Sequence, residues 1–342
     1  MKRITFSIVA LILSGFMATQ ADACTGISLR AEGGSRVVAR TVEWAASPMQ
    51  NGYVIAPRGH KHQSYTPSGL NGLEYKSIYG YVGLYTEYEA FVVEGINEAG
   101  LSAGLFFFPG YGDYTGYDPA HNTRTLCDMQ FVSWVLSQFS NIEQVKEGLR
   151  GLDLVTLNNK IGSVHWRITE PGGKMVVLEV VGGVPHFYEN KLGVLTNAPG
   201  FLWHTTNLKV AAPPLVGGNK MIGTPGDFTS PSRYIRAAFM QSTAPTWETG
   251  YETVLQAFHI LNNFDIQIGV QHERENIPKG LPSATQFTSA SDLQSLKLYY
   301  RTCWNSNIRC IDLMDIDFHK VKYQSRALDV IQSQPIEVIK VR

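Results

Sequence analysis

The residues best able to do chemistry near the start of this chain are grouped around one cysteine. Cys24 follows Ala21 and Ala23, which have the Ala-x-Ala spacing of a signal-peptide cleavage site. Cleavage after Ala23 would make Cys24 the first residue, with a thiol and a free α-amine. An α-amine with a pKa of about 7.7 to 8.0 can accept the thiol proton near neutral pH. The position therefore predicts a nucleophile that carries its own base.

Two other interpretations of Cys24 fit the same residues. A lipoprotein signal also ends at a cysteine, although Ala21 and Asp22 here fill the places where that signal usually has Leu and a small residue. An exported cysteine can also be an ordinary disulfide partner. The nucleophile, the lipid anchor and the disulfide all remain open on these residues alone.

The residues before Cys24 have the three-part anatomy of a secretory signal peptide. Lys2 and Arg3 precede a mostly apolar stretch over residues 4–17, and small and polar residues follow. That stretch is shorter than the about 20 residues that span a bilayer as a helix, and no later segment reaches that length. We expect residues 1–23 to be removed and residues 24–342 to form a periplasmic or secreted protein without a membrane span.

The charge balance and the cysteine count exclude several classes of protein. The chain has 29 basic and 29 acidic residues, which leaves no surplus charge for nucleic acid or an anionic membrane. Four cysteines are far fewer than a disulfide scaffold contains. Cys303 and Cys310 flank WNSNIR between two strand-like runs, and we expect them to form a disulfide across a hairpin. The composition favours a small organic molecule as the partner.

The common signatures of metal and nucleotide chemistry are missing. There is no HExxH, and His60 and His62 lie in a polar loop that is typical of surface histidines. A G-x-S-x-G elbow, a P-loop and a dinucleotide fingerprint are also absent. We expect no metal and no organic cofactor, so Cys24 is the strongest catalytic candidate.

A cysteine nucleophile requires a cation that favours the thiolate, an acceptor for the α-amine and donors for an oxyanion. The run ARTVEW offers Arg40 as the cation and Glu43 as the acceptor. Both are polar members of a β-rich run, so a solvated strand face is the alternative interpretation.

The elements that must position these residues alternate between strands and helices. Helical spacing covers residues 126–139, a capping-box pattern at 140–143 opens a second helix, and a third helix is expected over 247–262. No repeat or linker divides the chain, so we expect one domain of antiparallel sheets with helices outside. The strand-like runs are TGISLR, SRVVARTVEW, GYVIAP, AFVVEGI, LSAGLFFF, VHWRITEPGGKMVVLEVV, LGVLTNAP, a last hairpin and an alternating C-terminal tail.

Six segments, in chain order, resemble the choloylglycine hydrolase family, which includes bile salt hydrolases and penicillin V acylases. They are CTGISLR, ARTVEW, INEAGLSAGL, GVLTNAPGFLWHTTNL, PGDFTSPSRYIRA and YYRTCWNSNIRCIDL. The resemblance spans nearly all of residues 24–342. It implies an α+β fold, a four-layer αββα sandwich of two antiparallel sheets, of the N-terminal-nucleophile hydrolase type. It also implies that Cys24 becomes the terminal catalytic residue and cleaves linear amides.

The same resemblance implies roles for four other residues. Arg40 matches the arginine beside the nucleophile, and Glu43 falls where the family usually has an aspartate that contacts the α-amine. Asn197 in LTNAP matches the asparagine that donates to the oxyanion, and Arg233 in SPSRYIRA matches a second active-site arginine. Glutamate adds a methylene to the usual carboxylate, which changes the geometry of that role.

The segment after the family's Ala-Gly-Leu departs from the usual pattern. Many relatives have asparagine or tyrosine there, whereas this chain has Phe106, Phe107 and Phe108. Since a phenylalanine side chain cannot donate a hydrogen bond, we expect the backbone N–H of Phe106 or Phe107 to complete the oxyanion hole with Asn197. Trp44 and the three phenylalanines either line an apolar substrate pocket or pack in the core.

The resulting hypothesis is an exported cysteine amidohydrolase that cleaves conjugated bile salts, penicillin V or related N-acyl amides through a thioester. The alternatives are an N-acyl homoserine lactone acylase and a noncatalytic exported binding protein or lipoprotein on the same fold. The short separation of Asn197 from Arg233 resembles relatives from Gram-negative bacteria that lack a longer assembly loop. A homo-oligomer, dimer or tetramer, therefore stays open.

Overall fold

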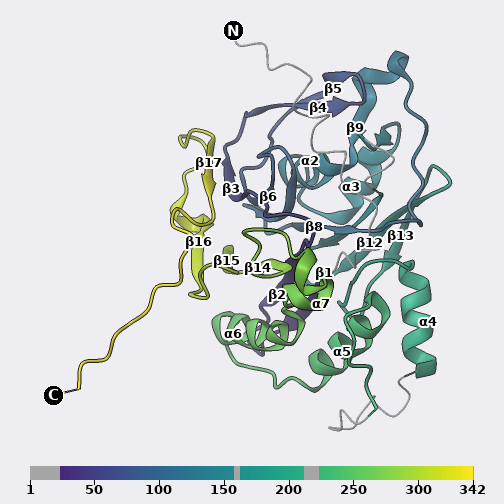
Figure 1. The fold of residues 1–342 in the computed structure, drawn as a ribbon. Helices are drawn as coiled ribbons and strands as arrows, with labels where there is room; N and C mark the ends of the chain where they lie inside the picture. The colour runs from purple at the N-terminus through teal and green to yellow at the C-terminus, as the bar shows by residue number, and fades with distance from the viewer. Residues whose placement is uncertain (1–23, 158–161, 212–222, 342) are drawn as a thin grey trace.

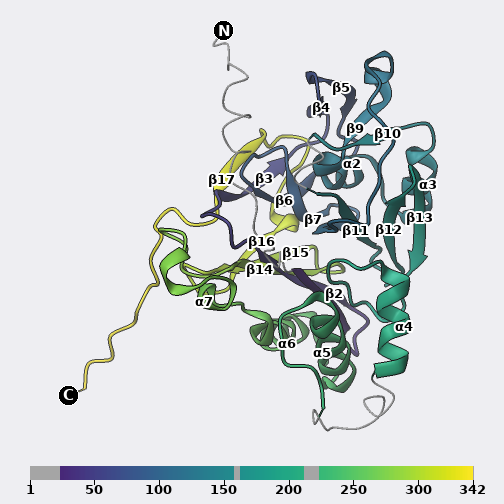
Figure 2. The same ribbon diagram turned by 45° about the vertical axis from the view of Figure 1, so that its right-hand side comes forward.

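Two antiparallel sheets stacked face to face form the centre of the protein, with helices on both outer sides (Figure 1). The computed structural model describes residues 24–157, 162–211 and 223–341. The predicted signal peptide, residues 1–23, lies outside these described residues. From one side to the other the layers are helix, sheet, sheet and helix, which is the predicted αββα sandwich (Figure 2).

The smaller central sheet contains the strand that begins with Cys24. Its order is β1-β2-β14-β15-β16, and all neighbours are antiparallel. The strands are β1 (Cys24–Arg30), β2 (Arg36–Glu43), β14 (Thr285–Asp292), β15 (Lys297–Thr302) and β16 (Arg309–Asp312). Because β1 is an edge strand, its outer side is open to another segment of the chain.

The larger central sheet has eight strands in the order β13-β12-β11-β8-β7-β6-β3-β17. They are β3 (Asn51–Ala56), β6 (Tyr81–Thr86), β7 (Val92–Asn97), β8 (Ser102–Phe107), β11 (Val164–Thr169), β12 (Met175–Val181), β13 (Val184–Glu189) and β17 (Gln324–Ala327). Two small two-stranded sheets lie outside this pair of layers. They consist of β4 (Lys61–Thr66) with β5 (Gly69–Lys76), and β9 (Thr125–Cys127) with β10 (Asp153–Val155).

The helices cover the outer faces of the two central sheets. Helices α5 and α6 pack on β1, β2 and β14, whereas α2 and α3 pack over the larger sheet (Figure 1). The helices are α2 (Phe131–Gln138), α3 (Ile142–Leu149), α4 (Phe201–Ala211), α5 (Ser230–Thr243), α6 (Gly250–Leu261) and α7 (Ile268–Gln271). One apolar core lies between the smaller sheet and α5 and α6, and a larger one extends from between the sheets to α2 and α3.

All three predicted helices begin later than their sequence patterns indicated. The segment 126–139 becomes α-helical only at Phe131, because β9 pairs with β10 in parallel and a 3₁₀ helix at Asp128–Gln130 follows it. The second helix is capped by Asn141, whose side chain accepts from the Gln144 N–H at 2.9 Å, rather than by Ser140. The third helix is α6, which begins with the capping box of Thr249 and Glu252.

The expected disulfide between Cys303 and Cys310 is wrong, since both thiols are free. The antiparallel register of β15 and β16 places Cys310 opposite Tyr299. Cys303 lies just beyond β15, and its N–H donates to the carbonyl of Gln286 at 2.9 Å, which draws it toward β14 instead of β16. The hairpin was therefore predicted correctly, but its register separates the two cysteines.

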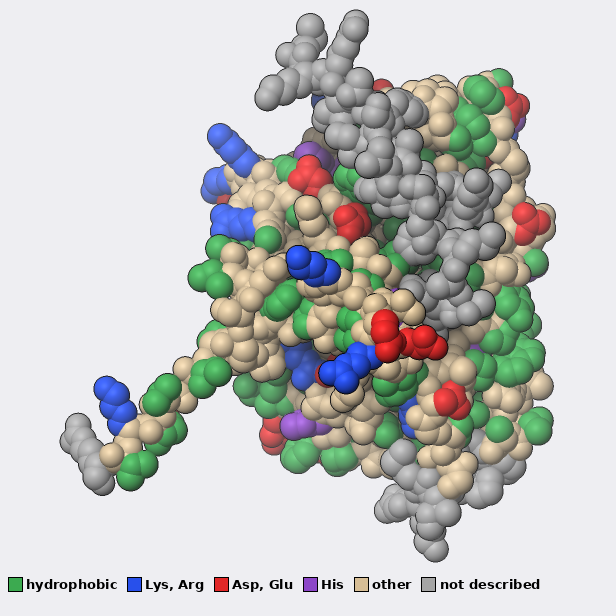
Figure 3. Space-filling view, viewed as in Figure 1, with side chains coloured by type: hydrophobic (Ala, Val, Ile, Leu, Met, Phe, Trp, Pro, Cys, Tyr) green, Lys and Arg blue, Asp and Glu red, His purple; other side chains and the backbone are tan. Residues whose placement is uncertain are grey.

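The segments LGVLTNAP and the C-terminal tail are not the continuous strands that their patterns suggested. The first makes an isolated bridge from Leu195 to Gly26, and the second contains β17 alone. The chain beyond β17 leaves the body as an extended arm in Figure 3 and exposes most of its apolar side chains. Among the residues that the structure describes, none of the helices has the length and apolar character that crossing a bilayer requires.

Candidate active site

The bridge between Gly26 and Leu195 brings Asn197 to Cys24. Gly26 N–H donates to the Leu195 carbonyl at 2.7 Å, and Leu195 N–H donates back at 3.1 Å. In an antiparallel pair, the residue two before Gly26 faces the residue two after Leu195. The backbone nitrogen of Cys24 accordingly donates to Oδ1 of Asn197 at 2.6 Å. The predicted nucleophile and the predicted oxyanion donor are therefore in direct contact.

The hydrogen bonds around the Asn197 amide determine which of its atoms is the oxygen. Nη2 of Arg233 donates to the same Oδ1 at 2.8 Å, and Nδ2 of Asn197 donates to the carbonyl of Phe107 at 2.8 Å. A flipped amide would place donor against donor and oxygen against oxygen. Because Nδ2 carries two N–H groups, one remains for an oxyanion after the bond to Phe107.

Two residues that sequence reasoning missed hold the backbone of Asn197. Its N–H donates to Oγ of Ser230 at 2.9 Å, and its carbonyl accepts from Nε2 of His204, also at 2.9 Å. Burial lowers the pKa of His204 to about 4, so the ring is neutral near neutral pH. The contact with the Asn197 carbonyl, which can only accept, places the ring proton on Nε2. His204 lies in the motif WHTTNL and Ser230 in SPSRYIRA, and these motifs were the sequence feature that could have indicated both residues. These contacts make the position of Asn197 independent of its side-chain bonds.

Arg233, on α5, ties the outer face of β1 to this cluster. Its Nη1 donates to the carbonyl of Cys24 and, at 3.0 Å, to Oγ1 of Thr25, while its Nε donates to the carbonyl of Phe228 at 2.9 Å. Burial lowers the pKa of Arg233 to about 10, which still leaves the guanidinium charged near neutral pH. A positive charge is therefore fixed against the nucleophile's own carbonyl.

Arg40 approaches from the space between the two sheets. Its guanidinium carbon lies 4.0 Å from the centre of the Phe106 ring, and Nη1 donates to the carbonyls of Leu105 and, at 3.2 Å, Val93. Burial raises the pKa of the Cys24 thiol, whereas the charges of Arg40 and Arg233 oppose that rise. That Arg40 favours the thiolate of a catalytic cysteine stays a prediction.

Glu43 lies on the opposite face of β2 from Arg40, because three residues separate them on a strand. Oγ1 of Thr285 donates to its Oε1 at 3.2 Å, and its Oε2 has no hydrogen-bond partner among the described residues. Burial raises the pKa of this carboxyl to about 8, although Arg233 opposes the rise. The nitrogen of Cys24 is held by Asn197 in this structure, so contact of Glu43 with an α-amine stays a prediction.

The four aromatic residues predicted to bind substrate differ in their exposure. The rings of Phe106 and Phe108 are buried; Phe106 packs in the cluster that contains Cys24, and Phe108 stacks on His165 with ring centres 4.4 Å apart. Trp44 and Phe107 are partly exposed. The role of the four residues in binding substrate stays a prediction. Trp44 and Phe107 are the two whose side chains could contact a substrate at the surface.

The backbone of Phe107 points toward Asn197 rather than into the sheet. Phe108 N–H donates to the Ser163 carbonyl at 2.7 Å, so Phe108 faces β11 and the backbone groups of Phe107 face the other side. The Phe107 carbonyl meets Nδ2 of Asn197 there. Since the N–H and carbonyl of one residue point to the same side of an antiparallel strand, the Phe107 N–H points the same way. Its role as a second oxyanion donor stays a prediction.

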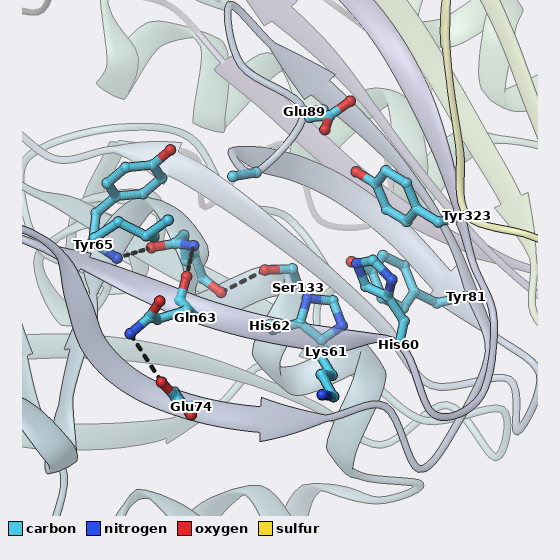
Figure 4. A pocket seen from close by; sticks show the side chains of 13 residues that line it. His60, Lys61, His62, Gln63, Tyr65, Glu74, Tyr81, Glu89, Ser133 and Tyr323 are labelled. Atoms are coloured by element: carbon cyan, nitrogen blue, oxygen red, sulfur yellow. Dashed lines mark hydrogen bonds between the residues drawn. The ribbon is translucent and has the colours of Figure 1, made fainter. Parts of the chain in front are cut away.

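A cavity of about 550 Å³ lies away from these residues, beside the β4–β5 hairpin (Figure 4). None of the predicted site residues lines it. His60 stacks on Tyr323 with ring centres 4.3 Å apart, and His62 stacks on Tyr75 at 4.7 Å. Both histidines are half-buried, and burial lowers the pKa of His62 to about 3, so its ring is neutral near neutral pH. Within residues 24–157, 162–211 and 223–341, no group of three or more metal-ligating side chains is placed to hold an ion.

A cysteine at the head of an edge strand in an αββα sandwich, beside an amide donor, is the arrangement of an amide hydrolase. The model of the family described as "Linear amide C-N hydrolases, choloylglycine hydrolase family" matches residues 24–327 of this chain. The chain belongs to this family and is a linear amide C–N hydrolase.

Individual relatives cover nearly the same length. A bile salt hydrolase/transferase of Clostridium perfringens is 30% identical over 324 residues, which are 87% of this chain and 95% of that protein. A bile salt hydrolase/transferase of Bifidobacterium longum subsp. longum is 26% identical over 314 residues, which are 86% of this chain and 96% of that protein.

Two solved structures show the same fold. A crystal structure of conjugated bile acid hydrolase from Clostridium perfringens has a TM-score of 0.75 at 26% identity and covers 93% of this chain and all of its own. Penicillin V acylase from Agrobacterium tumefaciens has a TM-score of 0.74 at 22% identity, over 91% of this chain and 95% of its own.

Proposed function

We propose that this chain is an exported amidohydrolase in which the Cys24 thiolate attacks the substrate carbonyl and forms a thioester. The observation that carries the proposal is the direct contact of Cys24 with Asn197, beside two guanidiniums. The new C–S bond converts the carbonyl into a tetrahedral oxyanion, which then collapses as the C–N bond breaks. Water attacks the thioester in the second half-reaction and releases the acid.

The α-amine that removal of residues 1–23 would expose carries the proton from one step to the next. This amine accepts the thiol proton and passes it to the leaving nitrogen, then accepts a proton from the attacking water. Oε2 of Glu43 has no partner among the described residues and can accept a hydrogen bond from the new ammonium. The family match begins at residue 24, which supports this position as the start of the mature enzyme.

The oxyanion is stabilised by the second N–H of the Asn197 amide and by the N–H of Phe107. Both lie on the same side of β8, where Asn197 meets the Phe107 carbonyl. Preorganised donors of this kind are effective because they need no rearrangement as the charge develops. His204 and Ser230 supply the preorganisation by holding the Asn197 backbone.

The substrate we propose is an amide of a bulky apolar acid. Several relatives are bile salt or conjugated bile acid hydrolases, which supports conjugated bile salts. Phe106 stands in place of the polar residue after Ala-Gly-Leu, and Phe107 and Trp44 supply partly exposed aromatic surface, which also fits penicillin V and N-acyl homoserine lactones. Arg40 and Arg233 are both buried, so neither offers an exposed cation to a substrate carboxylate or sulfonate.

A product assay tests the activity and the substrate class together. Glycocholate, taurocholate, penicillin V and a long-chain N-acyl homoserine lactone are incubated separately with the purified protein, and the released amine is measured. Cys24→Ser serves as the blank and Cys303→Ser as the matched control, which should keep wild-type activity. Equal turnover by Cys24→Ser would remove Cys24 as the nucleophile. Release from none of the four amides would refute the proposed substrate class.

Intact mass of the exported protein tests the processing step. A mass that begins at an unmodified Cys24 supports the nucleophile. A diacylglyceryl adduct on Cys24 would instead support the noncatalytic, lipid-anchored alternative.

A further inference from the structure

Three charged side chains are buried together between the two sheets. They are Arg40 on β2, Glu94 on β7 and Arg167 on β11, and each exposes 2% of its surface or less. Burying ions costs free energy unless they are well paired, so a group of three in a sheet interface needs a reason. Only Arg40 has a part in the mechanism described above.

The contacts show two cations on one carboxylate. Nη2 of Arg167 hydrogen-bonds to Oε1 of Glu94, and Nη1 of Arg40 lies 3.9 Å from Oε2. Oγ of Ser102 also donates to Oε1, at 3.4 Å. A Cβ at Gly104 would lie 2.3 Å from Oε2, so glycine is needed to leave room for the carboxylate. The three side chains, here called the buried triad, carry a net charge of one positive unit when ionised.

The ring of Phe106 connects the buried triad to the strand of the nucleophile. Its centre is 4.0 Å from the guanidinium carbon of Arg40 and 5.9 Å from that of Arg167. On its other side, the ring edge would be 2.8 Å from a Cβ at Gly26, two residues from Cys24. Phe106 and Cys24 belong to one packed cluster. The triad therefore lies on the side of β1 toward which the thiol packs.

We propose that Glu94 and Arg167 are positioning residues of the catalytic centre, which hold Arg40 against Phe106 and keep the surplus positive charge that favours the Cys24 thiolate. The proposal rests on the assignment of Cys24 as the nucleophile. Glu94 alone would neutralise Arg40, and Arg167 offsets that neutralisation. Without Glu94, the two guanidiniums would repel each other, and Arg40 would be held only by the carbonyls of Val93 and Leu105 and by Phe106.

This arrangement predicts opposite effects of two substitutions on Cys24. The charged groups that act electrostatically on the thiol are Arg40 and Glu43 from β2 and Arg233 from α5, and neither substitution replaces any of them. Glu94→Gln removes the negative charge and should lower the pKa of the thiol by about 1, whereas Arg167→Met should raise it by about 1. The double variant has lost one charge of each sign and should return close to the wild-type value.

The experiment measures alkylation of Cys24 by iodoacetamide as a function of pH, with the Cys24 peptide quantified by mass spectrometry. It needs no substrate, so its outcome is separate from whether the protein hydrolyses any particular amide. Asp128→Asn is the matched control, since Asp128 is a buried carboxylate of the α2 region and should leave the Cys24 profile unchanged.

Shifts in opposite directions, cancelled in the double variant, would support the proposal. Shifts in the same direction, or no shift in either single variant, would overturn it, because a purely structural role has no dependence on the sign of the charge. If Arg167→Met does not fold, Arg167→Gln takes its place, and the same opposite shifts in the two single variants are required.

Discussion

Asn197→Ala removes the residue on which most contacts of the site converge. The lost N–H donor should lower kcat by about 10²- to 10³-fold, or about 2.7–4 kcal/mol of transition-state stabilisation. The variant also leaves the Cys24 nitrogen and Nη2 of Arg233 without their shared acceptor, which lies 2.6 and 2.8 Å away. Each orphaned buried donor costs about 1–3 kcal/mol of folding free energy. Activity and stability should therefore both fall.

Asn197→Asp separates these two effects. Aspartate keeps an oxygen for the Cys24 nitrogen and for Arg233, but it replaces the donor that meets the Phe107 carbonyl with a second oxygen. We expect it to lose kcat as severely as Asn197→Ala while it keeps the contacts to Cys24 and Arg233.

The assay is kcat and KM from product release, together with the midpoint of thermal unfolding for each variant. Asn190→Ala is the matched control: Asn190 is a buried asparagine whose side chain bonds to Gly193 and Val194, in the loop before Asn197. It should lose stability without losing kcat. A loss of kcat below about tenfold in Asn197→Asp would refute the oxyanion role.

Two further predictions concern Glu43 and Gly26. Burial raises the pKa of Glu43 to about 8, so the folded protein keeps a proton that the unfolded chain releases from about pH 4.3 upward. The free energy of unfolding should therefore fall as pH rises through this window. Urea unfolding at about pH 5 and about pH 8 measures that fall, and Glu43→Gln should remove it. An equal fall in Glu43→Gln would contradict the raised pKa of Glu43. A Cβ at Gly26 would lie 2.8 Å from the Phe106 ring, so Gly26→Ala should lower the free energy of unfolding by about 1–3 kcal/mol in the same assay. Gly116→Ala, with open space around its Cβ position, should have no effect, and equal stability of both variants would show that Phe106 can move without cost.

The residues close to Cys24 in sequence could be predicted because strand periodicity and motif order both identify them. Arg40 and Glu43 follow from one run, and the bridge of Gly26 to Leu195 explains why a motif near residue 197 belongs to the same site. His204 and Ser230 could not be assigned roles, because they act through the backbone of Asn197 and carry no pattern of their own.

Glu94 and Arg167 were missed for a related reason. They lie in the strands VVEGIN and VHWRIT, and all residues of both strands are buried. Their meeting depends on the order of β7, β8 and β11 in the larger sheet, which the sequence does not state. The error over Cys303 and Cys310 has the same origin, since a hairpin can be recognised without its register.

The separation of the site residues along the chain has a consequence for how the protein folds. Cys24 bonds to Asn197 across 173 residues and to Arg233 across 209. Contacts between such distant parts of a chain require the closure of long loops and form slowly. The edge of β1 receives Leu195 only after β13 is synthesised, and the Cys24 carbonyl receives Arg233 only after the start of α5 is synthesised. A chain that ends before residue 197 thus lacks the contact of Cys24 with Asn197, so amide cleavage would report that this distant part of the chain has been made and has folded onto β1.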